Sequence, residues 1–173
     1  MRPAPHWNVS ALSMPELPEV EATRRHLEPV LSGARVVRAD VRRDRMVRRQ
    51  ERPVDFADRI AGRRVETLDR IGKFMVAPLE GDLTWVTHLG MSGRMQIAGS
   101  DEPEAPHTNV VLHLDSGQEV RFVDPRTFGF MVVYTPDEYE ASPMGRLGRD
   151  ALVDLPRTPR LMALLEDRSA PIK

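Results

Sequence analysis

The segment MPELPEVE (residues 14–21) places a methionine before a proline and then three carboxylates within six residues. If translation starts at Met14 and this residue is removed, Pro15 becomes the N-terminal residue and its nitrogen is a free secondary amine. Such an amine can attack an aldehyde carbon, as a lysine does in Schiff-base enzymes. Because the nitrogen already carries two carbons, the adduct is a charged iminium, which is a good electron sink. The alternative is structural, because Pro18 and the acids also suit the first turn of a helix.

A lysine opens an apolar run in the segment Ile71-Gly72-Lys73-Phe74. The only other lysine in the chain is Lys173. An amine beside apolar neighbours can relay protons. The alternative is an ordinary lysine at the edge of a strand.

Two glycines in the segment HLGMSGR (residues 88–94) predict a sharp turn that exposes Met91. A flexible thioether at the tip of a turn suits a wedge that fills a void. His88 suits either a phosphate contact or the core, and we assign it to the core.

The segment VDPRTFG (residues 123–129) predicts a second turn, because an Asp-Pro pair starts it. Arg126 and Phe128 are two residues apart, so they point the same way if the backbone is extended. DNA-kinking proteins use such a pair, in which the ring enters the base stack and the guanidinium bonds a base edge. The alternative is a bulge with a buried phenylalanine and a surface arginine.

The periodicity of apolar residues and the composition predict the strands and helices that must position these residues. The chain has 173 residues, 40% of them hydrophobic, with 15 prolines and 11 glycines, which favours one β-rich domain with many turns. We predict a mainly β (α+β) fold, a β-sandwich of about eight strands flanked by helices. Alternating patterns predict strands at residues 35–42, 64–71, 73–79, 84–89, 94–97, 109–114, 119–123 and 130–134, and helical patterns fall at 16–32, 56–61 and 156–168.

Composition also excludes some classes of protein. The absence of cysteine excludes disulfides and thiolate zinc sites, and the five histidines show no metal-ligand spacing, so we expect no metal. No apolar run is long enough to cross a membrane, so we expect a cytoplasmic protein. The net charge is −1, yet residues 35–64 hold eleven arginines and five acids. That excess indicates either a phosphate-facing patch or a solvated surface.

Taken together and in this order, the segments MPELPEVEATRRHL, GKF, HLGMSG and DPRTFG closely resemble the formamidopyrimidine-DNA glycosylases, a branch of the bacterial base-excision-repair glycosylases. The resemblance covers residues 14–173. It implies an enzyme that removes oxidised purines, such as 8-oxoguanine and formamidopyrimidines, from damaged double-stranded DNA and then nicks the abasic strand. It also implies that Pro15 is the nucleophile that attacks the deoxyribose C1′, that Glu16 is the acid/base partner, and that Lys73 is the proton donor in β-elimination.

The same resemblance implies the residues that bind DNA. Met91 and Arg126 fill the space left by the flipped base, and Phe128 wedges the base stack. His107 matches a phosphate-contacting histidine, and Arg168 matches a further DNA contact. This set favours the formamidopyrimidine branch over the endonuclease VIII branch, whose wedge differs.

Two departures from the family pattern set the expected domain limits. Residues 1–13 precede Met14, and we interpret them as an extension from a mis-called start codon. Residues 14–140 are the expected catalytic sandwich, and residues 141–173 are a linker and the start of a truncated helix–two-turn–helix domain. The family zinc finger is absent, so we expect no cofactor in this chain.

Three functions are therefore compared. The first is a glycosylase with abasic-site lyase chemistry, acting as a monomer on DNA in the cytoplasm, near the nucleoid, and not on a membrane. The second is a truncated, inactive remnant that binds DNA weakly. The third is an unrelated β-sandwich that binds another protein.

Overall fold

The computed structural model describes residues 14–147 and 157–166. The elements follow in the order α1 (Leu17–Leu31), β1 (Val36–Val41), η1 (Asp44–Val47), α2 (Pro53–Ile60), β2 (Asp69–Ile71), β3 (Phe74–Leu79), β4 (Leu83–His88), β5 (Arg94–Gly99), β6 (Thr108–Leu114), β7 (Gln118–Val123), β8 (Phe130–Tyr134), α3 (Pro136–Ala141), η2 (Pro143–Arg146) and α4 (Thr158–Leu165), where η marks a 3-10 helix.

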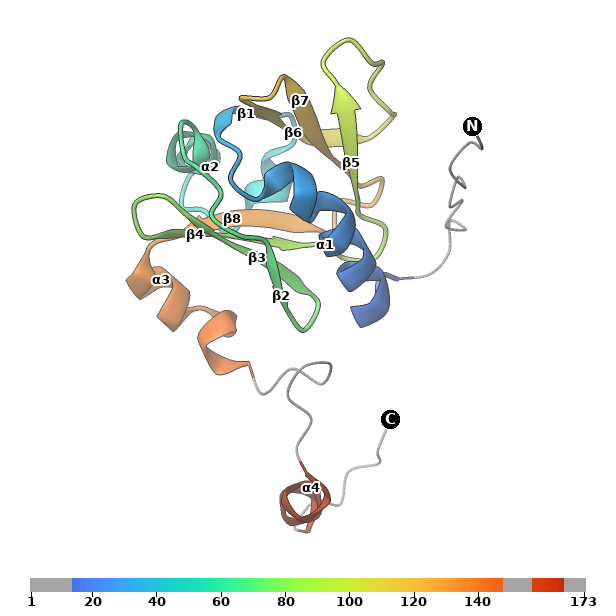
Figure 1. Cartoon of the computed structure of the whole chain (residues 1–173), viewed down its shortest axis with the longest axis vertical. Coiled ribbons are helices and arrows are strands. Elements are labelled where there is room, and N and C mark those ends of the chain that lie inside the picture. The colour runs from blue at the N-terminus through green and yellow to red at the C-terminus, as the bar shows by residue number, and fades with distance from the viewer. Residues whose placement is uncertain (1–13, 148–156, 167–173) are drawn as a thin grey trace.

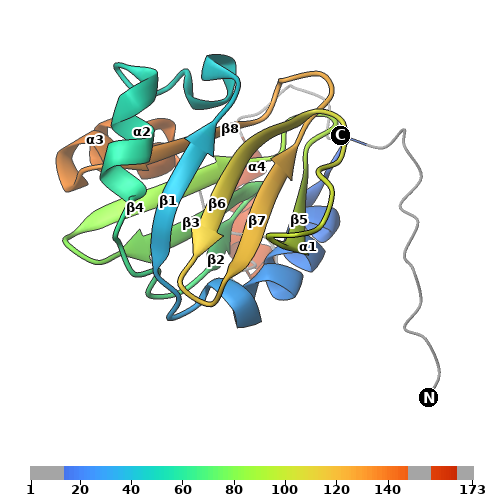
Figure 2. The same ribbon diagram turned by 90° about the horizontal axis from the view of Figure 1, so that it is seen from above.

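The strands form two antiparallel sheets of four strands each, in the orders β1-β6-β7-β5 and β2-β3-β4-β8. The two sheets are stacked, with α1 and α2 beside them (Figure 1). Seen from above, β1, β6, β7 and β5 form one layer in front of β3, β4 and β8 (Figure 2). Helix α1 contacts β2 and β3 of one sheet and β5 of the other, whereas α2 contacts β1 and β8. Each helix therefore bridges both sheets, and the predicted β-sandwich flanked by helices is confirmed.

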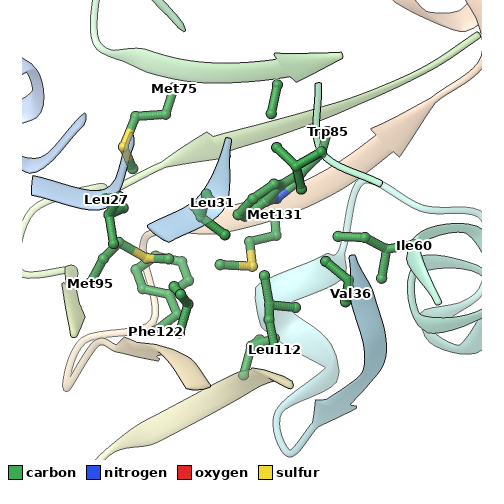
Figure 3. Packing of buried hydrophobic residues seen from close by; sticks show 14 of the residues in the cluster. Leu27, Leu31, Val36, Ile60, Met75, Trp85, Met95, Leu112, Phe122 and Met131 are labelled. Atoms are coloured by element: carbon green, nitrogen blue, oxygen red, sulfur yellow. The ribbon is translucent and has the colours of Figure 1, made fainter. Parts of the chain in front are cut away.

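Alternation along the strands builds the core between the sheets. In β6, Val110 and Leu112 belong to the buried cluster between the layers, whereas the side chain of His113 joins an ion-pair network. Leu27 and Leu31 of α1 enter the same cluster beside Phe122 and Met131 (Figure 3). Burying such a side chain contributes about 1.5–3 kcal/mol. This packing fixes α1, and with it the residue that precedes the helix.

The sheet β2-β3-β4-β8 is also covered on its outer face. Val76, Val86, Phe130 and Val132 form a second buried cluster with Met144 of η2. Helix α3 contacts β4 and β8. Strands β3 and β8 contribute to both clusters and are therefore apolar on both faces, which explains their nearly continuous apolar sequences.

The structure differs from the predicted elements in one strand and in two helical segments, which are η1 and α3–η2. The expected strand at residues 64–71 is regular only over β2, because Arg64 bridges Arg35 while Val65 bridges Leu79. This stretch therefore changes its partner from Arg35 to Leu79 of β3 before the regular pairing of β2 with β3 begins. The helical segment α3–η2 was not predicted, although Thr135 accepts a hydrogen bond from the Glu138 N–H as a helix cap. Among the helices that the structure describes, none is long and apolar enough to span a membrane.

Candidate active site

Glu16 and Lys73 form an ion pair at one end of the sandwich. Glu16 immediately precedes α1, and its backbone N–H donates to Oε2 of Glu19 at 3.0 Å. Lys73 lies in the turn between β2 and β3. Lys73 Nζ is 2.5 Å from Glu16 Oε2, with the two side chains 41% and 53% exposed. An ammonium and a carboxylate are thus held together where a substrate in solvent can reach them.

A nearly buried arginine connects α1 to the turn that carries Lys73. Arg70 Nε lies 3.1 Å from Oε2 of Glu21, and these side chains are only 3% and 15% exposed. Arg70 Nη1 also donates to the Gly72 carbonyl at 2.9 Å, next to Lys73. The Arg24 guanidinium, followed by Arg25 and Arg70, lowers the pKa of Glu21 to about 2. This network fixes the helix start relative to the lysine.

Pro15 is half-buried and directly precedes Glu16. In the 173-residue sequence Met14 is bonded to the nitrogen of Pro15, so this nitrogen is an amide. An amide lone pair is delocalised into the carbonyl and is not nucleophilic. In a chain that begins at Pro15 the nitrogen is an amine, one residue away from the Glu16 carboxylate and the lysine paired with it.

Arg126 and Phe128 project from the loop between β7 and β8, which we call the DPRTFG loop (residues 124–129). Both side chains are exposed, and the Arg126 guanidinium carbon lies 5.1 Å from the centre of the Phe128 ring. Thr127 between them adopts a positive φ of 53°. The cation and the ring lie close together, but the extended backbone on which the prediction depended is wrong, because Thr127 adopts a left-handed conformation and residues 125 and 126 form a turn.

Met91 and His107 lie on two neighbouring segments. Met91 is half-buried in the turn between β4 and β5. That turn packs against the DPRTFG loop, because a Cβ added at Gly90 would lie 2.4 Å from the Gly129 nitrogen. His107 is exposed, and its carbonyl accepts a hydrogen bond from the Asp124 N–H at 3.1 Å. The fold therefore connects the predicted DNA-binding segments, apart from Arg168, which lies outside the described residues.

Most of the eleven arginines at residues 35–64 fall into two groups. One group pairs with carboxylates, and its members Arg35, Arg38, Arg42, Arg52 and Arg59 contact Glu80, Asp40, Glu104, Asp55 and Glu138, respectively. The other group lies around the DPRTFG loop. Arg45 donates to the Thr127 carbonyl at 3.3 Å, and Arg48 donates to the carbonyls of Phe128 at 2.9 Å and Gly129 at 2.6 Å. This second group adds positive charge beside the candidate site.

His88 lies between the lysine end of the site and the outer cluster. Its ring stacks on Phe130 at 5.6 Å and contacts Phe74 at 4.8 Å, while Nδ1 accepts a hydrogen bond from the Gly90 N–H at 3.0 Å. Burial, followed by the nearby charges of Lys73 and Arg49, lowers the pKa of His88. The imidazole is therefore neutral at pH 7 and acts as a hydrogen-bond acceptor for the turn that carries Met91.

Sequence reasoning missed the arginines that support the site. Arg48 belongs to an arginine-rich stretch and Arg70 is a single arginine in a strand pattern, so no spacing marks either residue as a support of the site. The described residues contain no group of three or more His, Cys, Asp or Glu side chains able to hold a metal ion.

Comparison with known proteins assigns the fold and motifs to a family. The family described as formamidopyrimidine-DNA glycosylase N-terminal domain matches residues 14–131. The chain belongs to the formamidopyrimidine-DNA glycosylase family. The match includes every candidate residue named above except Arg168, and it begins at Met14.

Relatives of this family cover most of the chain. A formamidopyrimidine-DNA glycosylase of Ruegeria pomeroyi is 41% identical in an alignment that covers 92% of this chain and 59% of the relative. One of Caulobacter vibrioides is 43% identical in an alignment that covers 72% of this chain and 47% of the relative. The chain thus spans about half to three fifths of the length of these formamidopyrimidine-DNA glycosylases.

Solved structures of the family share the fold. The wild-type Lactococcus lactis Fpg (MutM) in complex with DNA containing N7-benzyl-Fapy-dG matches with a TM-score of 0.68 at 26% identity, over 76% of this chain and 47% of that one. The same enzyme in complex with DNA containing an abasic site matches with a TM-score of 0.68 at 25% identity, over 76% and 48%.

Proposed function

We propose that this chain carries the catalytic residues of a DNA glycosylase and abasic-site lyase that removes oxidised purines from double-stranded DNA. The observation that carries the proposal is the 2.5 Å contact between Lys73 Nζ and Glu16 Oε2, directly beside Pro15. It provides an amine position, a carboxylate and an ammonium at one exposed point. The Lactococcus lactis relative has been captured with a Fapy-dG analogue and with an abasic site, which supports the same substrate class for this chain.

In the proposed reaction the Pro15 amine attacks the deoxyribose C1′ of a flipped nucleotide. The glycosidic bond breaks, and its electron pair leaves with the base, which takes up a proton. Ring opening then yields an iminium between Pro15 and C1′, with Glu16 moving protons at the sugar. The iminium acidifies the C2′ hydrogen, so that loss of this proton expels the 3′ phosphate, and Lys73 supplies a proton during this β-elimination. Water finally releases Pro15, so the chemistry needs no cofactor.

DNA binding in this proposal uses the DPRTFG loop and its neighbours. Extruding a base costs a few kcal/mol, so residues that occupy the vacated space are required beside the nucleophile. Met91, Arg126 and Phe128 fill this role, His107 contacts a phosphate, and Arg168 makes a further contact with DNA. The protein works as a monomer in the cytoplasm, in association with the nucleoid, where its DNA substrate lies.

Borohydride trapping tests this function. We would join residues 14–173 to the C-terminal part of the Ruegeria pomeroyi relative, and we call the product the joined protein. With Met14 removed, it should form a covalent adduct with 8-oxoguanine or abasic DNA, because borohydride reduces the iminium to a stable amine. Keeping residues 1–13 should abolish the adduct, because they acylate the nitrogen.

Two results would contradict the proposal. Equal trapping with residues 1–13 present would show that the nucleophile is not Pro15, and Lys73 would become the candidate nucleophile. A folded joined protein that begins at Pro15 and gives no adduct would favour the inactive remnant.

A further inference from the structure

Asp124 is a charged residue with no exposed surface, at the junction of β7 and the DPRTFG loop. Its Oδ1 accepts hydrogen bonds from Ser92 Oγ at 2.5 Å and from the Arg126 N–H at 3.2 Å. Its Oδ2 accepts one from the Gly129 N–H at 2.8 Å. Burying a carboxylate is costly unless it is well hydrogen-bonded, so this position has a specific structural role.

The backbone of Asp124 connects to a third segment. Its N–H donates to the His107 carbonyl at 3.1 Å, and its carbonyl accepts from Asn109 Nδ2 at 2.8 Å. One buried residue thus joins the turn that carries Met91, through Ser92, the segment that carries His107, and both ends of the loop that carries Arg126 and Phe128.

Arg48 interacts electrostatically with Asp124 and binds the same loop. Arg48 donates hydrogen bonds to the carbonyls of Phe128 and Gly129, and Asp124 accepts hydrogen bonds from the N–H groups of Arg126 and Gly129. The loop backbone is therefore held on its donors by one side chain and on its acceptors by another. A loop fixed in this way loses little further conformational freedom when it enters DNA.

From these contacts we infer that Asp124 is a positioning residue that sets the relative placement of Met91, His107, Arg126 and Phe128 before DNA binds. The inference rests on the proposed function, because it assigns these four residues to lesion recognition. Asp124 itself touches no substrate and acts through the segments it holds.

An amide cannot replace this carboxylate. All three groups that point at the Asp124 side chain are donors, and the asparagine amide has only one acceptor oxygen. Asp124→Asn would therefore place an NH₂ group against either the Gly129 N–H or the pair formed by Ser92 and Arg126. Ser92→Ala removes one donor and leaves the carboxylate intact, so its effect should be smaller.

The test uses the joined protein beginning at Pro15. In single-turnover excision of 8-oxoguanine from duplex DNA, Asp124→Asn should be slower by about 10- to 100-fold, because small misplacements of positioning groups have effects of this size. Single-stranded abasic DNA has no paired base to displace, so trapping of Asp124→Asn on it should stay within about twofold of wild type. The rate of 8-oxoguanine excision by Ser92→Ala should lie between the rates of the wild type and of Asp124→Asn.

A spectroscopic readout separates this role from general stability. 2-Aminopurine placed opposite an abasic analogue brightens when a side chain unstacks it. The wild type should produce this rise, Asp124→Asn should lose most of it, and Asp58→Asn, an exposed aspartate of α2, should keep it. This signal requires DNA binding but no chemistry, so it tests Asp124 even if the wild type forms no adduct and the proposed function fails.

The inference is overturned if Asp124→Asn excises 8-oxoguanine and brightens 2-aminopurine as the wild type does. It is also overturned if excision and single-stranded trapping fall by the same factor in a protein with wild-type circular dichroism. If Asp124→Asn does not fold, Ser92→Ala decides, because unchanged excision and fluorescence in that variant would refute the inference and a selective loss would support it.

Discussion

Lys73 Nζ lies 2.5 Å from Glu16 Oε2, although α1, β1, α2 and β2 separate the two residues along the chain. The contact depends on the packing of α1 against both sheets and on the ion pair of Arg70 with Glu21. An exposed ion pair of this kind adds little stability, typically about 0–1 kcal/mol. Its importance is therefore in positioning the two groups for chemistry.

Removing either partner should impair the proposed reaction more than the stability of the fold. In the joined protein, Lys73→Ala and Glu16→Gln should each slow nicking of the DNA strand at 8-oxoguanine by about 10²–10⁴-fold, the range for loss of a positioned acid or base. The double variant should be less impaired than the product of the two effects, because the residues interact. Single-turnover kinetics would measure this. Glu80→Gln, which breaks the similarly exposed pair with Arg35, serves as the control and should leave the rate unchanged.

Glu21 should make stability depend on pH. Its pKa is lowered from 4.5 to about 2 in the folded state, so its contribution is fully present above pH 4.5 and is lost as pH falls towards 2. At pH 7, Glu21→Gln should lower the free energy of unfolding of the chain by about 1–3 kcal/mol, since lowering a pKa by one corresponds to about 1.4 kcal/mol before solvent screening. Urea denaturation at pH 7 and pH 3 would measure this difference, which should shrink at the lower pH.

Glu28→Gln is the matched control for that experiment, because Glu28 is 48% exposed and pairs with Arg24 on the same helix. Glu28→Gln should lower the free energy of unfolding by less than about 1 kcal/mol. An equal loss in the two variants would contradict the view that the Glu21 network holds α1 in place.

The contact between the Met91 turn and the DPRTFG loop should tolerate no side chain at Gly90. Gly90 has a φ of +66°, and an added Cβ would lie 2.4 Å from the Gly129 nitrogen and 2.6 Å from the Phe128 carbonyl carbon. Gly90→Ala should therefore lower the free energy of unfolding by about 2–4 kcal/mol, from backbone strain plus overpacking. Thermal denaturation would measure the change.

Gly117 offers the comparison for Gly90. Its φ is +82°, but no heavy atom lies within 4 Å of an added Cβ. Gly117→Ala should lower the free energy of unfolding by only about 1 kcal/mol, from backbone strain alone. If the two variants are equally destabilised, the packing of the two segments is not tight.

Residues 14–173 without any added domain should bind DNA weakly. The described part of the chain offers few phosphate contacts, because most arginines of residues 35–64 pair with acids or carbonyls. Two or three contacts give a slope of the logarithm of affinity against the logarithm of salt concentration of about −2 to −3. Fluorescence anisotropy at several salt concentrations would measure it, and nanomolar, lesion-selective binding would refute the prediction.

Arg126 and Phe128 should affect DNA recognition in the joined protein and not in residues 14–173 alone. Arg126→Ala and Phe128→Ala should change the weak binding of residues 14–173 little, yet reduce lesion excision by the joined protein by about tenfold or more, since unstacking must be offset by contacts on both flanks. Val37→Ala, another exposed apolar residue, should change neither. A large loss in both proteins would mean that the sandwich recognises the lesion without the added domains.

The sequence predicted the sandwich because most strands carry a regular pattern. The segment at residues 109–114 alternates between the core and the outer face, and the hairpin at Gly117 follows where turn residues occur. The stretch at residues 64–68 was harder, because its alternation is compatible with a long strand while its partners change within two residues.

The supporting contacts of the site could not be predicted in the same way. Arg70 reaches Glu21, and Arg48 reaches Phe128, across long stretches of sequence. In a chain with 25 lysines and arginines, nothing local distinguishes these two from the rest. Residue types and order indicated Pro15, Glu16 and Lys73, whereas the tertiary fold alone shows what holds their neighbours in place.

The cover that α3 and η2 provide has a practical consequence for anyone shortening the protein. Met144 and Tyr139 pack on the outer face of the sheet against Val76, Val86 and Val132. A version ending near residue 134 would leave that apolar face open to solvent, next to the edge strand β2, and such surfaces promote self-association. The minimal soluble unit therefore extends at least through Arg146, beyond the last strand of the sandwich.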